Sequence, residues 1–229
     1  MKRGAPLNPF SARFHRPGAL PYRFREGESA KTLWRRFLDA GRRGAIVGPH
    51  GTGKTTLLRS LEPVARSAGE AVHVVTLHDG QRWPPELLEG VRAPCPPLAA
   101  VLGARASSPT HRRTLFLDGA EQLAPAAWLA LRLWTRVRGI GLLVATHRPL
   151  GLQTLHTTLV DAETALWVAK SIVERHPSLP LLVRAECVEA ALARKNGNLR
   201  EALFHLYDVY EDRWNIHAGC DSNRAHTST

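Results

Sequence analysis

Residues 48–55 constrain the fold of this chain more than any other segment. They read Gly-Pro-His-Gly-Thr-Gly-Lys-Thr and match the pattern G-x-x-x-x-G-K-[ST] in full. A short apolar run at residues 45–47 precedes them, and residues 53–67 follow as a helical pattern with an apolar face. A glycine-rich turn between a strand and a helix can point successive backbone N–H groups at one anion, and the helix N-terminus adds positive potential. The segment therefore predicts a loop that binds the phosphates of a nucleotide.

The residue types in this loop have distinct expected tasks. Lys54 supplies a charge to the β- and γ-phosphates, and the Thr55 hydroxyl ligates Mg²⁺. We therefore expect ATP with Mg²⁺ as the ligand. The predicted nucleotide-binding residues of the loop are Gly48, Pro49, His50, Gly51, Thr52, Gly53, Lys54, Thr55 and Thr56.

Strand-like and helix-like segments alternate around the loop. Further apolar runs with the length of buried strands lie at residues 71–77, 114–117 and 141–145, and a fifth strand is expected near residues 158–160. Helices are expected at residues 30–40 and from Pro125 onward. This alternation specifies a parallel sheet that is covered on both faces. We therefore predict an α/β fold with a P-loop NTPase core over residues 30–160.

The rest of the chain divides into several predicted parts. Residues 1–29 are rich in proline, arginine and aromatic side chains, and they are interpreted as an extended arm laid on the core. Residues 161–214 contain helical patterns only and predict a small helical lid domain. Residues 215–229 are mostly polar, small and charged, which predicts a disordered tail. Prolines break residues 79–112 into loops and short helices.

Two acidic residues follow the apolar run at residues 114–117. Asp118 closes the run, where a carboxylate beside the phosphate loop is placed to help hold Mg²⁺; the alternative is an ordinary strand-end aspartate in a turn. Glu121 lies three residues later and is the only nearby acid that could polarise an attacking water. An acid in the first turn of a helix also has a capping role. Both interpretations of Glu121 stay open at this point.

A polar pair ends the fourth predicted strand. Thr146 closes that strand and His147 follows it. A polar group at this place can reach the γ-phosphate or hold the water, and Thr146 is the favoured candidate. The alternative for His147 is a histidine in a surface loop.

The net charge of +11 bears on partners rather than on the fold. Nucleic acid or another polyanion is one interpretation. The other is coding bias, because arginine supplies 26 of the 31 basic residues and is scattered along the chain.

The cysteines and the apolar segments bear on the compartment. Cys95, Cys187 and Cys220 lie far apart and form neither a disulfide framework nor a pair of zinc ligands. The chain has no apolar stretch long enough for a transmembrane helix and no apolar run after its basic N-terminus. The expectation is a cytoplasmic protein without membrane insertion.

The chain resembles the AAA+ ATPases, which are P-loop NTPases with an additional catalytic acid. The resemblance rests on the phosphate loop, on Asp118 and Thr146 at strand ends, and on the helical C-terminal region. Residues 197–203, Gly-Asn-Leu-Arg-Glu-Ala-Leu, are similar to the family's lid motif, in which an arginine reaches the nucleotide. Arg200 matches that arginine; its alternative role is an exposed helix arginine. Residues 117–123 resemble, more loosely, a segment of ATPases that serve transposition and secretion systems.

The sequence departs from the family pattern in two places. Gly119 stands where these ATPases usually carry the catalytic acid, so hydrolysis is a less direct prediction than binding. No single arginine stands out as the one that would act on a neighbouring subunit's nucleotide. The candidates are Arg132, Arg136, Arg138 and Arg148. The resemblance implies a protein partner and, where a ring forms, a homo-oligomer.

Three functions stay open: an ATPase that drives or regulates a partner, a slow nucleotide-dependent switch, and a small-molecule phosphotransferase. P-loop kinases also use arginine-bearing lids, so the loop alone does not exclude the third. The intervening strand between the loop and Asp118, and the polar-ended strand after it, are typical of the AAA+ sheet and favour the first two. The predicted catalytic residues are Lys54, Glu121, Thr146 and Arg200, and the predicted Mg²⁺ ligands are Thr55 and Asp118.

Overall fold

The computed structural model describes residues 7–225 except residues 15, 17, 79, 81, 83–111 and 178. The expectations for most of residues 79–112, for Cys95 and for the side chain of Cys220 lie outside the described part. The chain divides into two compact units. The sheet unit contains Pro21–Pro49 and Gly53–Thr158, and the helical unit contains Met1–Leu20, His50–Thr52 and Leu159–Thr229.

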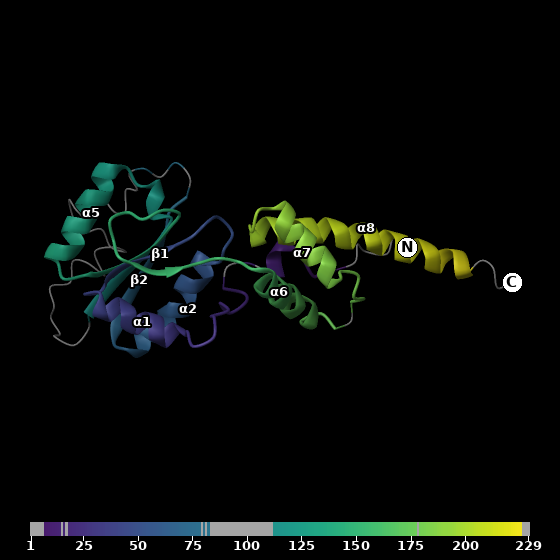
Figure 1. Ribbon diagram of the computed structural model, residues 1–229, viewed down its shortest axis with the longest axis horizontal. Coiled ribbons are helices and arrows are strands. Elements are labelled where there is room, and N and C mark those ends of the chain that lie inside the picture. The colour runs from purple at the N-terminus through teal and green to yellow at the C-terminus, as the bar shows by residue number, and fades with distance from the viewer. Residues whose placement is uncertain are drawn as a thin grey trace. The chain divides into compact units, whose positions relative to one another are not determined.

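Five parallel strands form the centre of the sheet unit (Figure 1). They are β1 (Arg43–Val47), β2 (Glu70–Thr76), β3 (Arg112–Asp118), β4 (Gly141–Thr146) and β5 (Thr154–Thr157). Their order in the sheet is β2-β3-β4-β1-β5, so β4 lies between β1 and β3. The predicted parallel α/β fold is therefore confirmed.

The fifth strand lies a few residues earlier than the sequence suggested. β5 ends at Thr157, whereas the expectation was a strand near residues 158–160. Its pairing partner is β1, which ends at Val47 before the loop, so β5 has no strand to pair with beyond that level. Thr158 makes the last contact, with its N–H donating to the Val47 carbonyl at 2.8 Å, and Leu159 is already exposed.

Helices cover both faces of the sheet, with α1 and α2 on one side and α5 on the other (Figure 1). Their bounds are α1 (Ala30–Asp39), α2 (Lys54–Ser67) and α5 (Pro125–Val137), and a short 3₁₀ turn, η2 (Ala120–Gln122), precedes α5. Ser29 caps α1 in a reciprocal capping box with Thr32. Pro125 occupies the first turn of α5, where its missing N–H costs no helical hydrogen bond.

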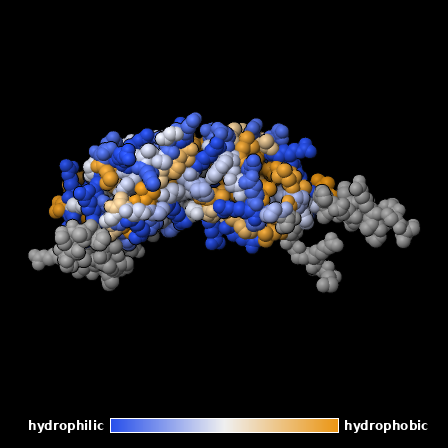
Figure 2. Space-filling view, turned by 90° about the horizontal axis from the view of Figure 1, so that it is seen from below, coloured by the Kyte–Doolittle hydropathy of each residue, from blue (hydrophilic) through white to orange (hydrophobic). Residues whose placement is uncertain are grey.

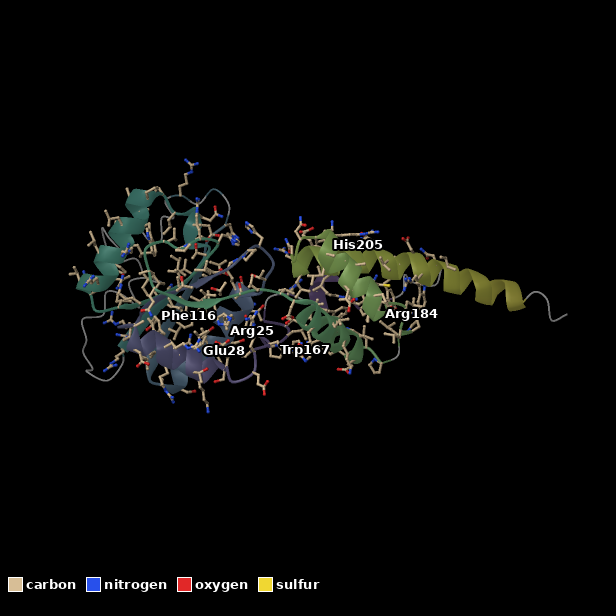
Figure 3. All side chains as sticks on the ribbon, in the orientation of Figure 1. Arg25, Glu28, Phe116, Trp167, Arg184 and His205 are labelled. Atoms are coloured by element: carbon tan, nitrogen blue, oxygen red, sulfur yellow. The ribbon has the colours of Figure 1, made fainter. Side chains whose placement is uncertain are left out.

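The side chains of β3 show how one strand serves two cores. Leu115 and Leu117 pack with α5, whereas Phe116 packs with α1 and α2. Successive side chains of a strand point to opposite faces, so a run of consecutive apolar residues fits a sheet that is buried on both sides. Phe116 lies inside the sheet unit and is fully buried (Figure 3).

The helical unit contains three α-helices: α6 (Ala162–Glu174), α7 (Ala185–Arg194) and α8 (Leu199–Ala225). Asp161 caps α6 by accepting the backbone N–H of Thr164 at 2.8 Å. The structure corrects the expected end of the last helix, because α8 continues beyond Trp214 through Ala225. The backbone hydrogen bonds of a helix do not depend on apolar side chains, and no proline lies within residues 215–225.

The N-terminal arm differs most from its expectation. Its residues 7–20 belong to the helical unit, whereas only residues 21–29 belong to the sheet unit, on whose core the whole arm was expected. Phe10 is fully buried against Tyr210 in the core of that unit, with ring centres 6.3 Å apart. Asn8 is also buried, and its amide donates to the Tyr207 carbonyl and to the Glu211 carboxylate, both at 3.0 Å. The arm therefore completes the core of the helical unit.

Hydrophilic and apolar residues are mixed over the face of the molecule shown in Figure 2. Within the part of the chain that the structure describes, every helix is too short or too polar to cross a membrane.

Phe10→Ala is expected to lower the free energy of unfolding by about 3–5 kcal/mol, because it removes a buried aromatic side chain and leaves a cavity. The measurement is denaturant unfolding followed by circular dichroism. Leu7→Ala is the matched control in the same arm, since Leu7 is 42% exposed and its loss should change stability little. Equal stability of the two variants would contradict the assignment of the arm to the core.

Candidate functional site

The strand order brings three chain segments together at the carboxyl edge of the sheet. Val47 at the end of β1 is paired with Thr146 at the end of β4, and Asp118 at the end of β3 is paired with Ala145. The residues that follow these strands therefore emerge side by side. In open parallel sheets this edge is where ligands bind.

The phosphate loop joins β1 to α2. Gly51 and Gly53 have φ values of +72° and +92°, a region that glycine adopts without strain. Gly53 is the N-cap of α2, and among the described residues no side chain caps this helix. The first N–H groups of α2 and the positive end of its dipole are therefore suited to an anion such as a phosphate.

Lys54 begins α2 and turns its ammonium group back toward the loop. Nζ donates to the carbonyls of Gly48 and Pro49, each at 2.7 Å, and lies 3.2 Å from Nδ1 of His147. Burial lowers the pKa of Lys54 below its ordinary value, while the carboxylates of Glu121 and Asp118 act to raise it. The ammonium group of Lys54 thus lies among polar atoms of the loop and of His147.

The two predicted metal ligands contact each other. The Thr55 hydroxyl donates to Oδ2 of Asp118 at 2.5 Å. Burial raises the pKa of Asp118, and the hydrogen bond from Thr55 and the charge of Lys54 act in the opposite direction. A hydroxyl and a carboxylate are hard oxygen donors, which suit Mg²⁺. Among the described residues, no group of three or more His, Cys, Asp or Glu is placed to hold a metal ion.

The backbone at Gly119 disfavours an acidic residue directly after Asp118. Its φ is +80°, and a Cβ built there would come 2.9 Å from the Leu77 carbonyl oxygen. A glutamate at this position would therefore be strained and crowded by the neighbouring backbone. The turn instead leads into η2, which carries Glu121 with a side chain only 10% exposed.

His147 joins the two groups that the sequence left separate. Its Nε2 lies 2.9 Å from Oε1 of Glu121, and its Nδ1 faces Lys54. Sequence reasoning gave this histidine less weight than Thr146. The available signal was its position directly after a strand end at the carboxyl edge.

The hydroxyl of Thr146 has a different set of contacts. Oγ1 donates to the Arg148 carbonyl at 2.9 Å and accepts the Arg148 N–H at 3.4 Å. Thr146 is fully buried, and these bonds hold the turn in which His147 sits. Its predicted contact with the γ-phosphate or the water stays a prediction.

The remaining predicted residues lie in several environments. Thr52 is buried and Thr56 half-buried, whereas Pro49 and His50 are exposed. In the helical unit, Arg200 is exposed in the first turn of α8, with its guanidinium 5.9 Å from the ring centre of Phe204. The contact of Arg200 with a nucleotide stays a prediction.

Comparison with known proteins adds evidence on the fold. No family model and no curated protein sequence matches the chain. Among solved structures, the chain is similar to PCH-2 of C. elegans, an AAA+ ATPase, with a TM-score of 0.50 over 82% of this chain. The two sequences are 11% identical, and the match covers 66% of the PCH-2 chain, just under two thirds of its length. The likeness shows that the fold is AAA+-like.

Gly119→Ala is expected to be more destabilising than Gly139→Ala, its matched control. Both glycines have positive φ, which should cost alanine about 1–2 kcal/mol. Only Gly119 also lacks room for a Cβ, and this crowding should add about 1–3 kcal/mol. Unfolding free energies from denaturant titration test the difference, and equal values would show that Gly119 has room for a side chain.

Proposed function

We propose that this chain is an AAA+-like ATPase that binds ATP with Mg²⁺ and hydrolyses it to drive or regulate a partner. One observation carries the proposal: Lys54 and Thr55 from one chain segment meet Asp118 and Glu121 from another at the carboxyl edge of one parallel sheet. The AAA+-like fold supports the assignment of the nucleotide class.

Binding is assigned to the loop and the start of α2. The uncapped helix N-terminus favours negative charge, and Lys54 supplies a positive group whose partial burial strengthens its contact with phosphate oxygens. Lys54 now donates to two loop carbonyls, which are weaker partners than a phosphate anion. The exchange of partners is therefore favourable.

Thr55 and Asp118 are assigned to Mg²⁺. The ion would neutralise charge on the β- and γ-phosphates. Thr55 supplies the hydroxyl ligand. Asp118 supplies a nearby carboxylate that accepts the hydrogen bond from this hydroxyl. Their contact already aligns both oxygens before any ion is considered.

Hydrolysis is assigned to Glu121 as the general base. A water oxygen forms a bond to the γ-phosphorus while the bond from that phosphorus to the β,γ-bridging oxygen breaks, which yields ADP and phosphate. The proton of the water passes to the Glu121 carboxylate. Oε2 of Glu121 is buried and has no hydrogen-bond partner among the described residues, so it has a lone pair available for that proton.

The strand order bears on the alternative functions. β4 lies between the strand that precedes the loop and the strand that ends in Asp118, which is the interleaving expected of an AAA+ sheet. This order supports an ATPase over a small-molecule phosphotransferase. A slow switch would share the same fold and the same binding residues, so the rate of hydrolysis separates it from a motor.

The partner is proposed in general terms only. A second protein, or further copies of this chain, would receive the motion of the helical unit. Arg200 belongs to that unit, and we assign to it the predicted contact with the nucleotide. The charge of +11 makes nucleic acid a further proposed partner. ATP turnover measured with and without DNA tests that last proposal, and an unchanged rate would count against it.

Lys54→Ala is expected to weaken ATP binding by at least about tenfold, because a charge-assisted phosphate contact is lost. Isothermal titration calorimetry with ATP and Mg²⁺ measures the change. Lys170→Ala is the control, because the Lys170 side chain is 77% exposed on α6 and lies outside the site. Unchanged affinity in a folded Lys54 variant would refute the assignment of the loop.

Glu121→Gln is expected to leave ATP and Mg²⁺ bound and to slow hydrolysis by about 10²–10⁴-fold, the usual contribution of a positioned general base. Single-turnover hydrolysis at saturating ATP is the measurement, and Glu189→Gln on the exposed face of α7 is the control. A wild-type rate in Glu121→Gln would return Glu121 to a role at the start of the helix.

A further inference from the structure

His147 has contacts that the assigned roles of the site do not explain. It lies in the turn after β4, and its two ring nitrogens contact two different functional groups. Nδ1 is 3.2 Å from Nζ of Lys54, and Nε2 is 2.9 Å from Oε1 of Glu121. The ring therefore spans from the phosphate-binding lysine to the proposed general base.

The partners determine where the ring carries its proton. A carboxylate oxygen can only accept, so Nε2 must bear the hydrogen that bonds to Glu121. Nδ1 lies 3.2 Å from Nζ of Lys54, which can only donate, and 3.1 Å from the Gly48 carbonyl oxygen, which can only accept. The contact with Glu121 is therefore the one that decides the proton, and it requires that proton on Nε2. A second proton on Nδ1 would bond to the Gly48 carbonyl but would place two positive charges 3.2 Å apart.

The contact divides the two oxygens of Glu121 between two tasks. Oε1 accepts from His147, whereas Oε2 is buried and has no partner among the described residues. A buried acceptor without a hydrogen bond is unfavourable unless something uses it. Holding one oxygen fixes the orientation of the carboxylate and so fixes the direction of the other oxygen.

Glu121 and His147 lie in two separate turns. Glu121 lies in η2, a 3₁₀ turn of three residues that follows the left-handed Gly119. The turn around His147 is held by Thr146, which bonds both the N–H and the carbonyl of Arg148 on its far side. These bonds fix the backbone that carries the His147 ring, and the ring can therefore orient the carboxylate of Glu121.

We propose that His147 is the positioning residue for Glu121 and links it to Lys54. This inference rests on the proposed ATPase function and deepens it. His147 does not touch the reacting atoms. It orients the base by donating from Nε2, while its Nδ1 lies against Lys54 and the Gly48 carbonyl.

Two substitutions separate the two contacts. Glutamine places an amide nitrogen near the position of Nε2, so His147→Gln keeps a donor for Glu121. Asparagine places an oxygen near the position of Nδ1, so His147→Asn keeps an acceptor for Lys54 but does not reach Glu121. We expect His147→Asn and His147→Ala to lower kcat by about 10²-fold, the effect of misplacing a catalytic group. KM should change by less than about threefold, and His147→Gln should recover at least about tenfold of the lost rate.

Three controls make the result specific. His205→Asn on α8 (Figure 3) repeats the substitution in the helical unit and should not change kcat. Circular dichroism verifies that each variant is folded. In the Glu121→Gln background, His147→Asn should slow hydrolysis no further, because a positioning residue acts only through its base.

Several outcomes would overturn the inference. They are a wild-type kcat in His147→Ala, equal rates in His147→Asn and His147→Gln, or an additional loss in the double variant. If the wild-type chain itself does not hydrolyse ATP, the proposed function fails. Nitrogen NMR of the full chain, with His147→Asn used to assign the signal, still tests the inference in that case: protonation on Nε2 supports it, and a neutral ring protonated on Nδ1 overturns it.

Discussion

The position of β4 between β1 and β3 is the constraint on which the site depends. Parallel pairing in this order puts the ends of three strands at one level, so that Val47 pairs with Thr146, and Asp118 with Ala145. The loop, the carboxylate of Asp118 and the turn that carries His147 then emerge next to one another. Each segment is ordinary alone, and the backbone hydrogen bonds of the sheet give the group its rigidity.

A single backbone feature determines which residue can directly follow Asp118. Gly119 takes a left-handed conformation against the Leu77 carbonyl, which removes the position directly after Asp118 as a place for an acid. The next acid along the chain is Glu121, in the turn that follows. Oε1 of Glu121 lies 2.9 Å from Nε2 of His147, and Nδ1 of the same ring lies near Lys54 and the Gly48 carbonyl.

The helical unit shows how a polar-looking segment can belong to a core. The arm at residues 7–20 contains one fully buried aromatic residue, Phe10, and a buried amide, Asn8, whose hydrogen bonds go to α8. Burying an amide is tolerable only when its donors are satisfied, so the arm has a defined place on the helices. Proline-rich composition indicated an extended chain but contained no information on which surface that chain would cover.

The sequence by itself determined the features that depend on neighbouring residues. These include the glycine-rich turn before α2 and the helix itself, the Ser29 and Asp161 caps, and the apolar strands of a doubly covered sheet, since each follows from local hydrogen bonding and hydrophobic period. Tertiary structure alone decided the end of β5, the place of the arm and the contacts of His147. Those depend on segments far apart in the chain, and the free energy of such contacts is set by packing and pairing geometry rather than by residue type.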